Sequence, residues 1–190
     1  MDNIDKLLQW ELHPSRVFYA CRDAAGTRPR FVFTPDKSPI PEGATGWFVG
    51  EQNAYGFPLF MTGVRNGDER QKAFGKAVML AGIRPQKREG WFPCGEDIHH
   101  SMAFFLEVAA RLVLLRERTN PGDLLEFYKS LRYGGQWFGA PAAWQDGWWQ
   151  GRMCHRYFLN SSTLYLADAA LRSLPDTPEL QWLCGPLPDW

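Results

Sequence analysis

The sequence carries no net charge, because 21 lysines and arginines are balanced by 21 aspartates and glutamates. A neutral chain has no overall electrostatic attraction to nucleic acid or to an anionic membrane. A long apolar run is also missing, since the stretch from Met102 to Leu115 contains Glu107 and Arg111 and is too short and too charged to cross a bilayer. The N-terminal residues MDNIDKLLQW have no apolar core of the kind that marks a secretory signal. These absences favour a cytoplasmic protein with no membrane partner.

Closely spaced cysteines and familiar catalytic motifs are missing as well. The chain has four cysteines and no CxxC pair, which excludes a classical zinc ribbon. It contains no GxSxG, no GxxxxGK and no HExxH, so the signatures of α/β-hydrolases, P-loop proteins and zinc metalloproteases are absent. We therefore predict no resident cofactor and a protein that is not an enzyme, with free thiols in a reducing compartment.

Apolar and aromatic residues, by contrast, are plentiful. Nine tryptophans and 13 phenylalanines in 190 residues offer enough apolar area to offset the entropy lost on folding. A chain of this length fits one domain and buries roughly 70% of the surface that its unfolded form exposes. No repeat or linker divides it, so we predict a single globular domain over 1–190.

The first third of the sequence, over 14–64, is predicted to be rich in β-structure. After a short helix over 3–12, alternating and β-branched runs indicate strands, and a proline-rich loop follows the second of them. The predicted strands are Arg16–Cys21, Arg30–Thr34, Trp47–Gly50 and Phe57–Val64.

The middle of the chain, over 66–132, is predicted to be helical. Asp68 has the position of an N-cap for a helix that runs to Ala81. The strongest apolar period predicts a central core helix from Asp97 to Arg118, with Glu107 and Arg111 as an i,i+4 ion pair. A third helix is expected to begin at Asn120 and Pro121 and to end at Gly134–Gly135.

The last part, over 140–175, is predicted to contain a hairpin and a helix. Asp146–Gly147 is a strong two-residue turn signal, which predicts that Ala142–Gln145 pairs with Trp148–Phe158. A helix capped by Ser161 or Ser162 then runs to Leu174, and a tail rich in proline and tryptophan occupies 176–190. The order of elements predicts an α+β fold, with a β-rich N-terminal third packed on a helical C-terminal portion and one late tryptophan-rich hairpin.

One candidate for chemistry combines cysteines, histidines and an aspartate at a predicted helix start, where the helix dipole favours a thiolate. Such residues could hold zinc or supply the thiolate nucleophile of a hydrolase. Adjacent histidines point about 100° apart on a helix, which argues against a shared ion, and structural roles are the simpler interpretation. The residues concerned are Cys94, Asp97, His99, His100, Cys154 and His155.

A second candidate is the basic segment 65–88, which holds seven basic and three acidic residues when Glu89 is counted with it. Lys72 and Lys76 are four residues apart on one predicted helix face, and Arg84 follows in a loop. Several cations on one surface, with Trp91 or Phe92 for stacking, would suit a single-stranded nucleic acid. A solvated helix face is the simpler interpretation of this segment.

The third candidate is the aromatic hairpin region, whose tryptophans resemble the anchors of protein interfaces. Adjacent strand residues point to opposite faces, so one indole of the Trp148–Trp149 pair is expected at the surface unless the tail covers it. The leading hypothesis is therefore a non-catalytic binding protein that docks a macromolecular partner, most simply a protein, with nucleic-acid binding and a metal- or thiol-dependent hydrolase as alternatives. Its predicted binding residues are Trp137, Trp144, Trp148, Trp149, Lys72, Lys76 and Arg84.

Overall fold

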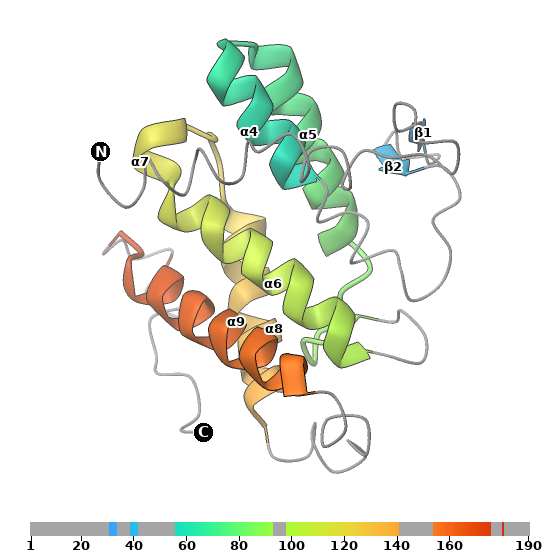
Figure 1. Cartoon of the computed structure of the whole chain (residues 1–190), viewed down its shortest axis with the longest axis vertical. Helices are drawn as coiled ribbons and strands as arrows, with labels where there is room; N and C mark the ends of the chain where they lie inside the picture. Colours follow the sequence, from blue (N-terminus) through green and yellow to red (C-terminus); the bar gives the residue numbers. More distant parts are fainter. Residues whose placement is uncertain are drawn as a thin grey trace.

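The structure of the chain is a computed structural model, and it describes residues 31–33, 39–41, 56–92, 98–140, 154–175 and 180. Apart from one short two-stranded ladder, every regular element in these ranges is helical (Figure 1). The helices are α4 (Gly56–Asn66), α5 (Glu69–Ile83), α6 (Ile98–Leu114), α7 (Arg116–Thr119), α8 (Leu125–Gly139) and α9 (Cys154–Arg172).

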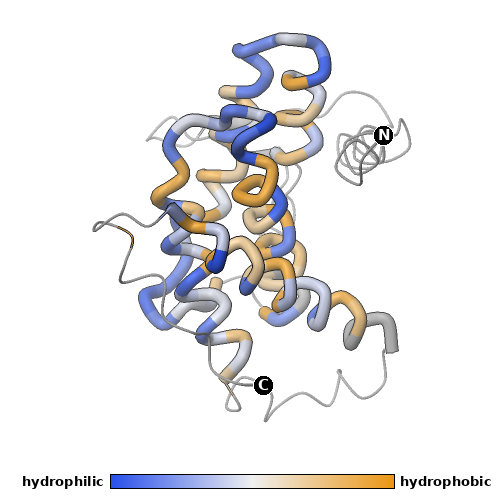
Figure 2. The backbone as a smooth tube through the Cα atoms, turned by 90° about the vertical axis from the view of Figure 1, so that its left-hand side faces the viewer, coloured by the Kyte–Doolittle hydropathy of each residue, from blue (hydrophilic) through white to orange (hydrophobic). Residues whose placement is uncertain are grey.

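Helices α4 and α5 form a tight helical hairpin. Phe57, Phe60 and Met61 recur at i, i+3 and i+4 along α4 and are almost completely buried. The two backbones approach so closely that a Cβ atom at Gly75 of α5 would overlap the backbone of Phe60. Figure 2 shows that the turn between the two helices is among the most hydrophilic parts of the molecule, whereas apolar segments lie where helices face one another.

Helix α6 is the centre of the fold, as its apolar period predicts. Met102, Phe105, Ala109 and Leu112 have no exposed surface, and α6 packs on both α8 and α9 (Figure 1). The helix ends at Leu114, one turn earlier than the sequence suggested, and the short α7 continues the chain. The predicted ion pair between Glu107 and Arg111 is present, with 2.7 Å between Oε1 and Nη2.

The contact between α6 and α9 is close and includes one buried hydroxyl. Small residues on both helices, Ala103 and Ala110 on α6 and Ala167 and Ala170 on α9, have no exposed surface. Thr163 is also completely buried, and its Oγ1 donates a hydrogen bond of 3.0 Å to the carbonyl of Ala103. Side chains this small allow the two helix axes to approach closely.

The predicted α+β fold with a β-rich region over 14–64 is wrong. Phe57–Val64, predicted as a strand, lies inside α4, because the apolar residues at 57, 60, 61 and 64 share one helix face. The described strands are only β1 (Phe31–Phe33) and β2 (Pro39–Pro41), which pair antiparallel with Val32 opposite Ile40. Pro39 and Pro41 have no amide hydrogen, which keeps β2 short. The predictions for 3–12, 16–21 and 47–50 lie outside the described residues.

Two predicted helix boundaries are also wrong. Asn120 caps the C-terminus of α7 in a left-handed conformation (φ 43°) instead of beginning the third helix, and α8 starts at Leu125. Gly134 and Gly135 lie inside α8, where a Cβ at Gly134 would come within 2.6 Å of Leu106 Cδ2 on α6. Gly134 therefore serves close helix packing instead of ending the helix.

The late hairpin is contradicted over its second half. Residues from Cys154 to Phe158, predicted as strand, form the first turns of α9, and Ser161 and Ser162 lie within that helix instead of capping it. Ser162 donates to the carbonyl of Leu159, one turn back along the same helix. The turn at Asp146–Gly147 and the tail beyond 180 lie outside the described residues.

Across the described ranges, none of the helices combines the length and the apolar character that crossing a bilayer requires. The buried core lies between the faces of α4, α5, α6, α8 and α9. One side of the contact between α5 and α8 is left unfilled, and this is where the candidate site lies.

Candidate ligand-binding cavity

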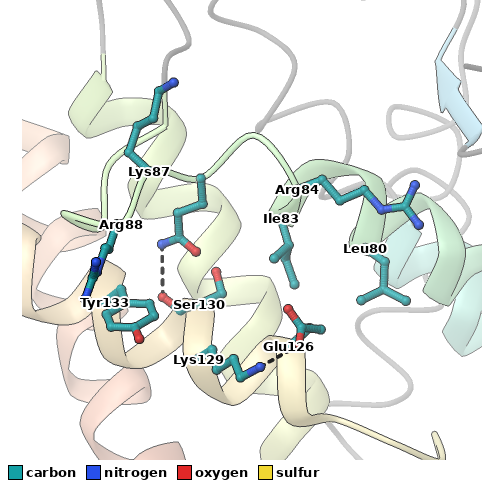
Figure 3. A pocket seen from close by; sticks show the side chains of 10 residues that line it. Leu80, Ile83, Arg84, Lys87, Arg88, Glu126, Lys129, Ser130 and Tyr133 are labelled. Atoms are coloured by element: carbon teal, nitrogen blue, oxygen red, sulfur yellow. Dashed lines mark hydrogen bonds and ion pairs between the residues drawn. The ribbon is translucent and has the colours of Figure 1, made fainter. Parts of the chain in front are cut away.

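A cavity of about 550 Å³ lies between the C-terminal end of α5, the loop that follows it, and one face of α8 (Figure 3). Its volume falls within the range of about 300–1,000 Å³ that is usual for small-molecule sites. The lining residues are Leu80, Ile83, Arg84, Gln86, Lys87, Arg88, Glu126, Lys129, Ser130 and Tyr133.

Helical spacing explains why these residues share the cavity. On α8, Glu126, Lys129, Ser130 and Tyr133 follow the i, i+3, i+4, i+7 pattern of one helix face. The opposite face of α8 carries core residues such as Leu131, which has no exposed surface. The same helix therefore packs into the core on one side and lines the cavity on the other.

The loop over 84–92 is held against α8 by specific hydrogen bonds. The side-chain amide of Gln86 donates to the carbonyl of Gly90 at 2.8 Å and to the carbonyl of Ser130 at 3.1 Å, and the second bond is drawn in Figure 3. Gly90 has a φ of 106°, and a Cβ there would overlap the carbonyl oxygen of Tyr133. Only glycine suits both the conformation and the close approach, so Gly90 fixes the loop where it closes the cavity.

Basic residues dominate the rim of the cavity. Arg84, Lys87, Arg88 and Lys129 line it together with Glu126, the one acidic residue among its described lining residues, which pairs with Lys129 at 2.9 Å. In Figure 3, Arg84 and Arg88 lie on opposite sides of the cavity, while Lys87 extends outward from the loop. An apolar wall is supplied by Leu80 and the buried Ile83. A positive potential above an apolar wall attracts an anion that also has an apolar part.

Ser130 adds a buried hydroxyl to the cavity lining. Only 1% of the residue is exposed, and its Oγ has no hydrogen-bond partner among the described residues. A serine hydroxyl can both donate and accept, and a buried polar group without a partner is rare. Its carbonyl, by contrast, is satisfied by Gln86.

The structure brings Arg84 to the cavity but places Lys72 and Lys76 elsewhere. Lys72 is buried and its amine lies 2.9 Å from Glu69 Oε1. Lys76 donates to the carbonyl of Pro121 at 2.7 Å and to that of Asp123, and thereby ties α5 to the segment before α8. Burial lowers the pKa of the Lys76 amine, with a smaller opposing effect from the Asp123 carboxylate. Both amines are engaged in contacts within the protein.

The aromatic residues proposed for base stacking have different environments. Phe92 is almost completely buried and packs edge-on against Phe105, with ring centroids 5.3 Å apart, so it belongs to the core. Trp91 is half-buried. Trp137 lies in α8, where its ring centroid is 5.2 Å from that of His99 of α6. The other tryptophans predicted to bind a partner, Trp144, Trp148 and Trp149, lie outside the described residues.

The cysteine and histidine cluster is described only in part. His99 lies in the first turn of α6, in contact with the rings of Trp137 and Phe138. The helical backbone includes His100 in α6, and Cys154 and His155 in α9, but their side chains, with Cys94 and Asp97, lie outside the described residues. Among the side chains that are described, no group of three or more histidines, cysteines or carboxylates could hold a metal ion.

The sequence alone identifies the cations of the loop as part of a basic segment, but it does not identify Lys129, Ser130 and Tyr133 as site residues. Their spacing on a predicted helix was visible, yet nothing local indicates that this face meets α5. No family model, curated protein or solved structure matches this chain.

Proposed function

We propose that the protein binds a small organic anion in the cavity between α5 and α8. The observation that carries the proposal is the combination of a cavity of about 550 Å³ with an apolar wall and a rim of four basic residues and one acidic residue. Sites for small molecules commonly pair an apolar lining with a few charged or polar groups that fix orientation.

The charges favour an anion over a neutral or cationic ligand. Arg84 and Arg88 line the cavity on opposite sides, so their positive charges attract an anionic group toward its rim (Figure 3). Guanidinium groups bind carboxylates and phosphates through paired hydrogen bonds. The apolar body of the ligand would lie against Leu80 and Ile83, where its burial adds to affinity.

Calorimetric titration with phenylpropanoate and phenyl phosphate tests this proposal. We expect saturable binding of these anions, and binding at least tenfold weaker for the neutral phenylpropanamide, because the amide has no charge for the rim. Affinity should also fall as salt is raised. Equal affinity for the carboxylate and the amide, or no binding of either anion at millimolar concentration, would contradict the proposal.

Charge-removing variants locate the binding. Replacing Arg84 and Arg88 together by glutamine should weaken phenylpropanoate binding about tenfold, which corresponds to roughly 1.4 kcal/mol. Arg70→Gln is the matched control, since Arg70 is an exposed arginine in the first turn of α5, outside the lining. A similar loss in both variants would indicate attraction by overall charge instead of binding in the cavity.

The hypotheses drawn from the sequence remain predictions. Docking of a protein partner depends on Trp144, Trp148 and Trp149, and the hydrolase depends on side chains outside the described residues. Capture of a nucleic acid by 65–88 also stays a prediction, and two of the cations that it invokes, Lys72 and Lys76, have partners within the protein. A cytoplasmic location likewise stays a prediction from the sequence.

A further inference from the structure

Ser130 lacks the local hydrogen bond that several other serine and threonine hydroxyls make in or next to the described helices. Thr62 and Thr119 donate to carbonyls four residues back, and Ser162 and Ser173 donate to carbonyls three residues back. This local bond is a common way in which serine or threonine is satisfied in a helix. Ser130 makes no such bond in the described structure, although it is almost completely buried.

The position of Ser130 shows what its hydroxyl could meet. Ser130 lines the cavity, on the same face of α8 as Lys129 and Tyr133 (Figure 3). The basic residues Arg84 and Arg88 are exposed at the rim, whereas Ser130 is almost fully buried. A ligand whose charged group stays at the rim would place its other end beside Ser130, whose buried side chain would then turn toward the cavity to bring its hydroxyl to the ligand.

We propose that the ligand carries an uncharged hydroxyl or carbonyl group, in addition to its anionic group and apolar body, and that this group hydrogen-bonds Ser130 Oγ. This inference rests on the proposed function, because it specifies the ligand of the same cavity. The ligand class is an amphipathic hydroxy- or oxo-acid or the corresponding phosphate. A site that holds a buried hydroxyl for a ligand's polar group discriminates strongly against analogues that lack that group.

The test compares phenylpropanoate with its ortho-, meta- and para-hydroxylated forms by calorimetric titration. We expect at least one hydroxylated form to bind the unaltered protein about tenfold more tightly than phenylpropanoate, as a new hydrogen bond to a buried group allows. In Ser130→Ala this preference for the hydroxylated form should disappear. The substitution keeps the Ser130 carbonyl that receives the Gln86 amide, so the loop should remain in place.

A stability measurement separates a ligand contact from a structural role. Ser130→Ala removes a hydroxyl without a partner and introduces the best helix former, so its melting temperature should equal or exceed that of the unaltered protein. Ser161→Ala is the matched control, because Ser161 is exposed on α9 and outside the cavity lining. It should leave both the affinity and the preference unchanged.

The outcomes distinguish the two proposals. If phenylpropanoate binds but no hydroxylated form binds more tightly, the role of Ser130 is overturned and the anion site stands. If Ser130→Ala weakens all probes equally and lowers the melting temperature, the hydroxyl is structural and the inference is also overturned. If none of the anions binds, the proposed function itself fails and the inference fails with it.

Discussion

Two buried helix interfaces each contain a hydroxyl group, which is hydrogen-bonded in one and has no partner among the described residues in the other. Between α6 and α9, the hydroxyl of Thr163 is completely buried and donates to the carbonyl of Ala103 at 3.0 Å. Between α5 and α8, the hydroxyl of Ser130 is almost equally buried but has no partner among the described residues. Buried alanines of α6 and α9 accompany the first hydroxyl, whereas a cavity of about 550 Å³ lies beside the second.

This difference indicates which interface is complete without a ligand. A buried hydroxyl bonded within the chain contributes to stability, typically by about 1 kcal/mol. A buried hydroxyl beside a cavity instead retains its hydrogen-bonding capacity for another molecule. The α6–α9 interface is thus structural, and the α5–α8 interface is the place where we expect binding.

The largest predicted effect concerns the glycine that closes the open interface. Gly90→Ala should destabilise the protein by roughly 3 kcal/mol and abolish probe binding, because both its positive φ and its contact with the Tyr133 carbonyl exclude a side chain. Gly67→Ala is the control, since Gly67 has a φ of 63° but a Cβ added there would meet no atom within 4 Å. Its cost should be only about 1 kcal/mol by urea unfolding. Equal losses in the free energy of unfolding for the two variants would show that the contact with the Tyr133 carbonyl does not exclude a side chain at position 90.

The second prediction compares the two hydroxyls directly. Thr163→Val keeps the shape of the side chain but leaves the α6–α9 interface without its hydrogen bond, so we expect a loss of about 1–2 kcal/mol in the free energy of unfolding. Ser130→Ala should cost nothing measurable. Chemical denaturation of both variants under the same conditions measures these changes in the free energy of unfolding. An equal loss in the two variants would contradict the proposed difference between a structural interface and a binding interface.

The smallest predicted effect concerns Tyr128 on α8. Burial raises the pKa of its phenol above the usual value of 10.0. The phenol has a higher pKa in the folded state, so above about pH 10 the unfolded state releases this proton more readily than the folded state. Deprotonation therefore favours unfolding, and the free energy of unfolding falls as pH rises through the interval between the two pKa values. The unaltered protein should therefore lose more stability than Tyr128→Phe as pH is raised from about 9 to 11. If the free energy of unfolding depends on pH in the same way in both proteins, the phenol of Tyr128 is hydrated and not buried.

Helices with a clear period and a clear cap could be predicted from the sequence. Asp68 accepts hydrogen bonds from the backbone of Arg70 and Gln71 at 3.0 Å, as an N-cap should. The apolar residues of α6 are buried as their spacing indicates. In both helices, local signals and tertiary packing favour the same structure.

Prediction failed where local signals were ambiguous. The run from Phe57 to Val64 contains aromatic and β-branched residues, which favour a strand, but its buried positions follow a helical period. Pro58 is tolerated because the first turn of a helix needs no amide hydrogen there. Gly134 and Gly135 look like a helix end, yet Gly134 lies inside α8 and packs closely against the Leu106 side chain.

The cavity could not be predicted because it depends on non-local packing. Arg84 and Lys129 are far apart in the sequence and line one cavity only because α5 lies beside α8. The buried state of Ser130 depends on the same contact, since the loop beside it is held by Gln86 and Gly90. Composition and spacing contain no information about which helix faces come together.

The most direct measurement is a map of backbone amide chemical shifts during titration with phenylpropanoate. We predict saturable shifts at residues 80–90 and 126–133, which surround the cavity, and none along the exposed face of α9 near Tyr165. Saturable shifts centred instead on α9 or on the tryptophans around Trp144–Trp149, or none at all, would contradict a ligand site between α5 and α8.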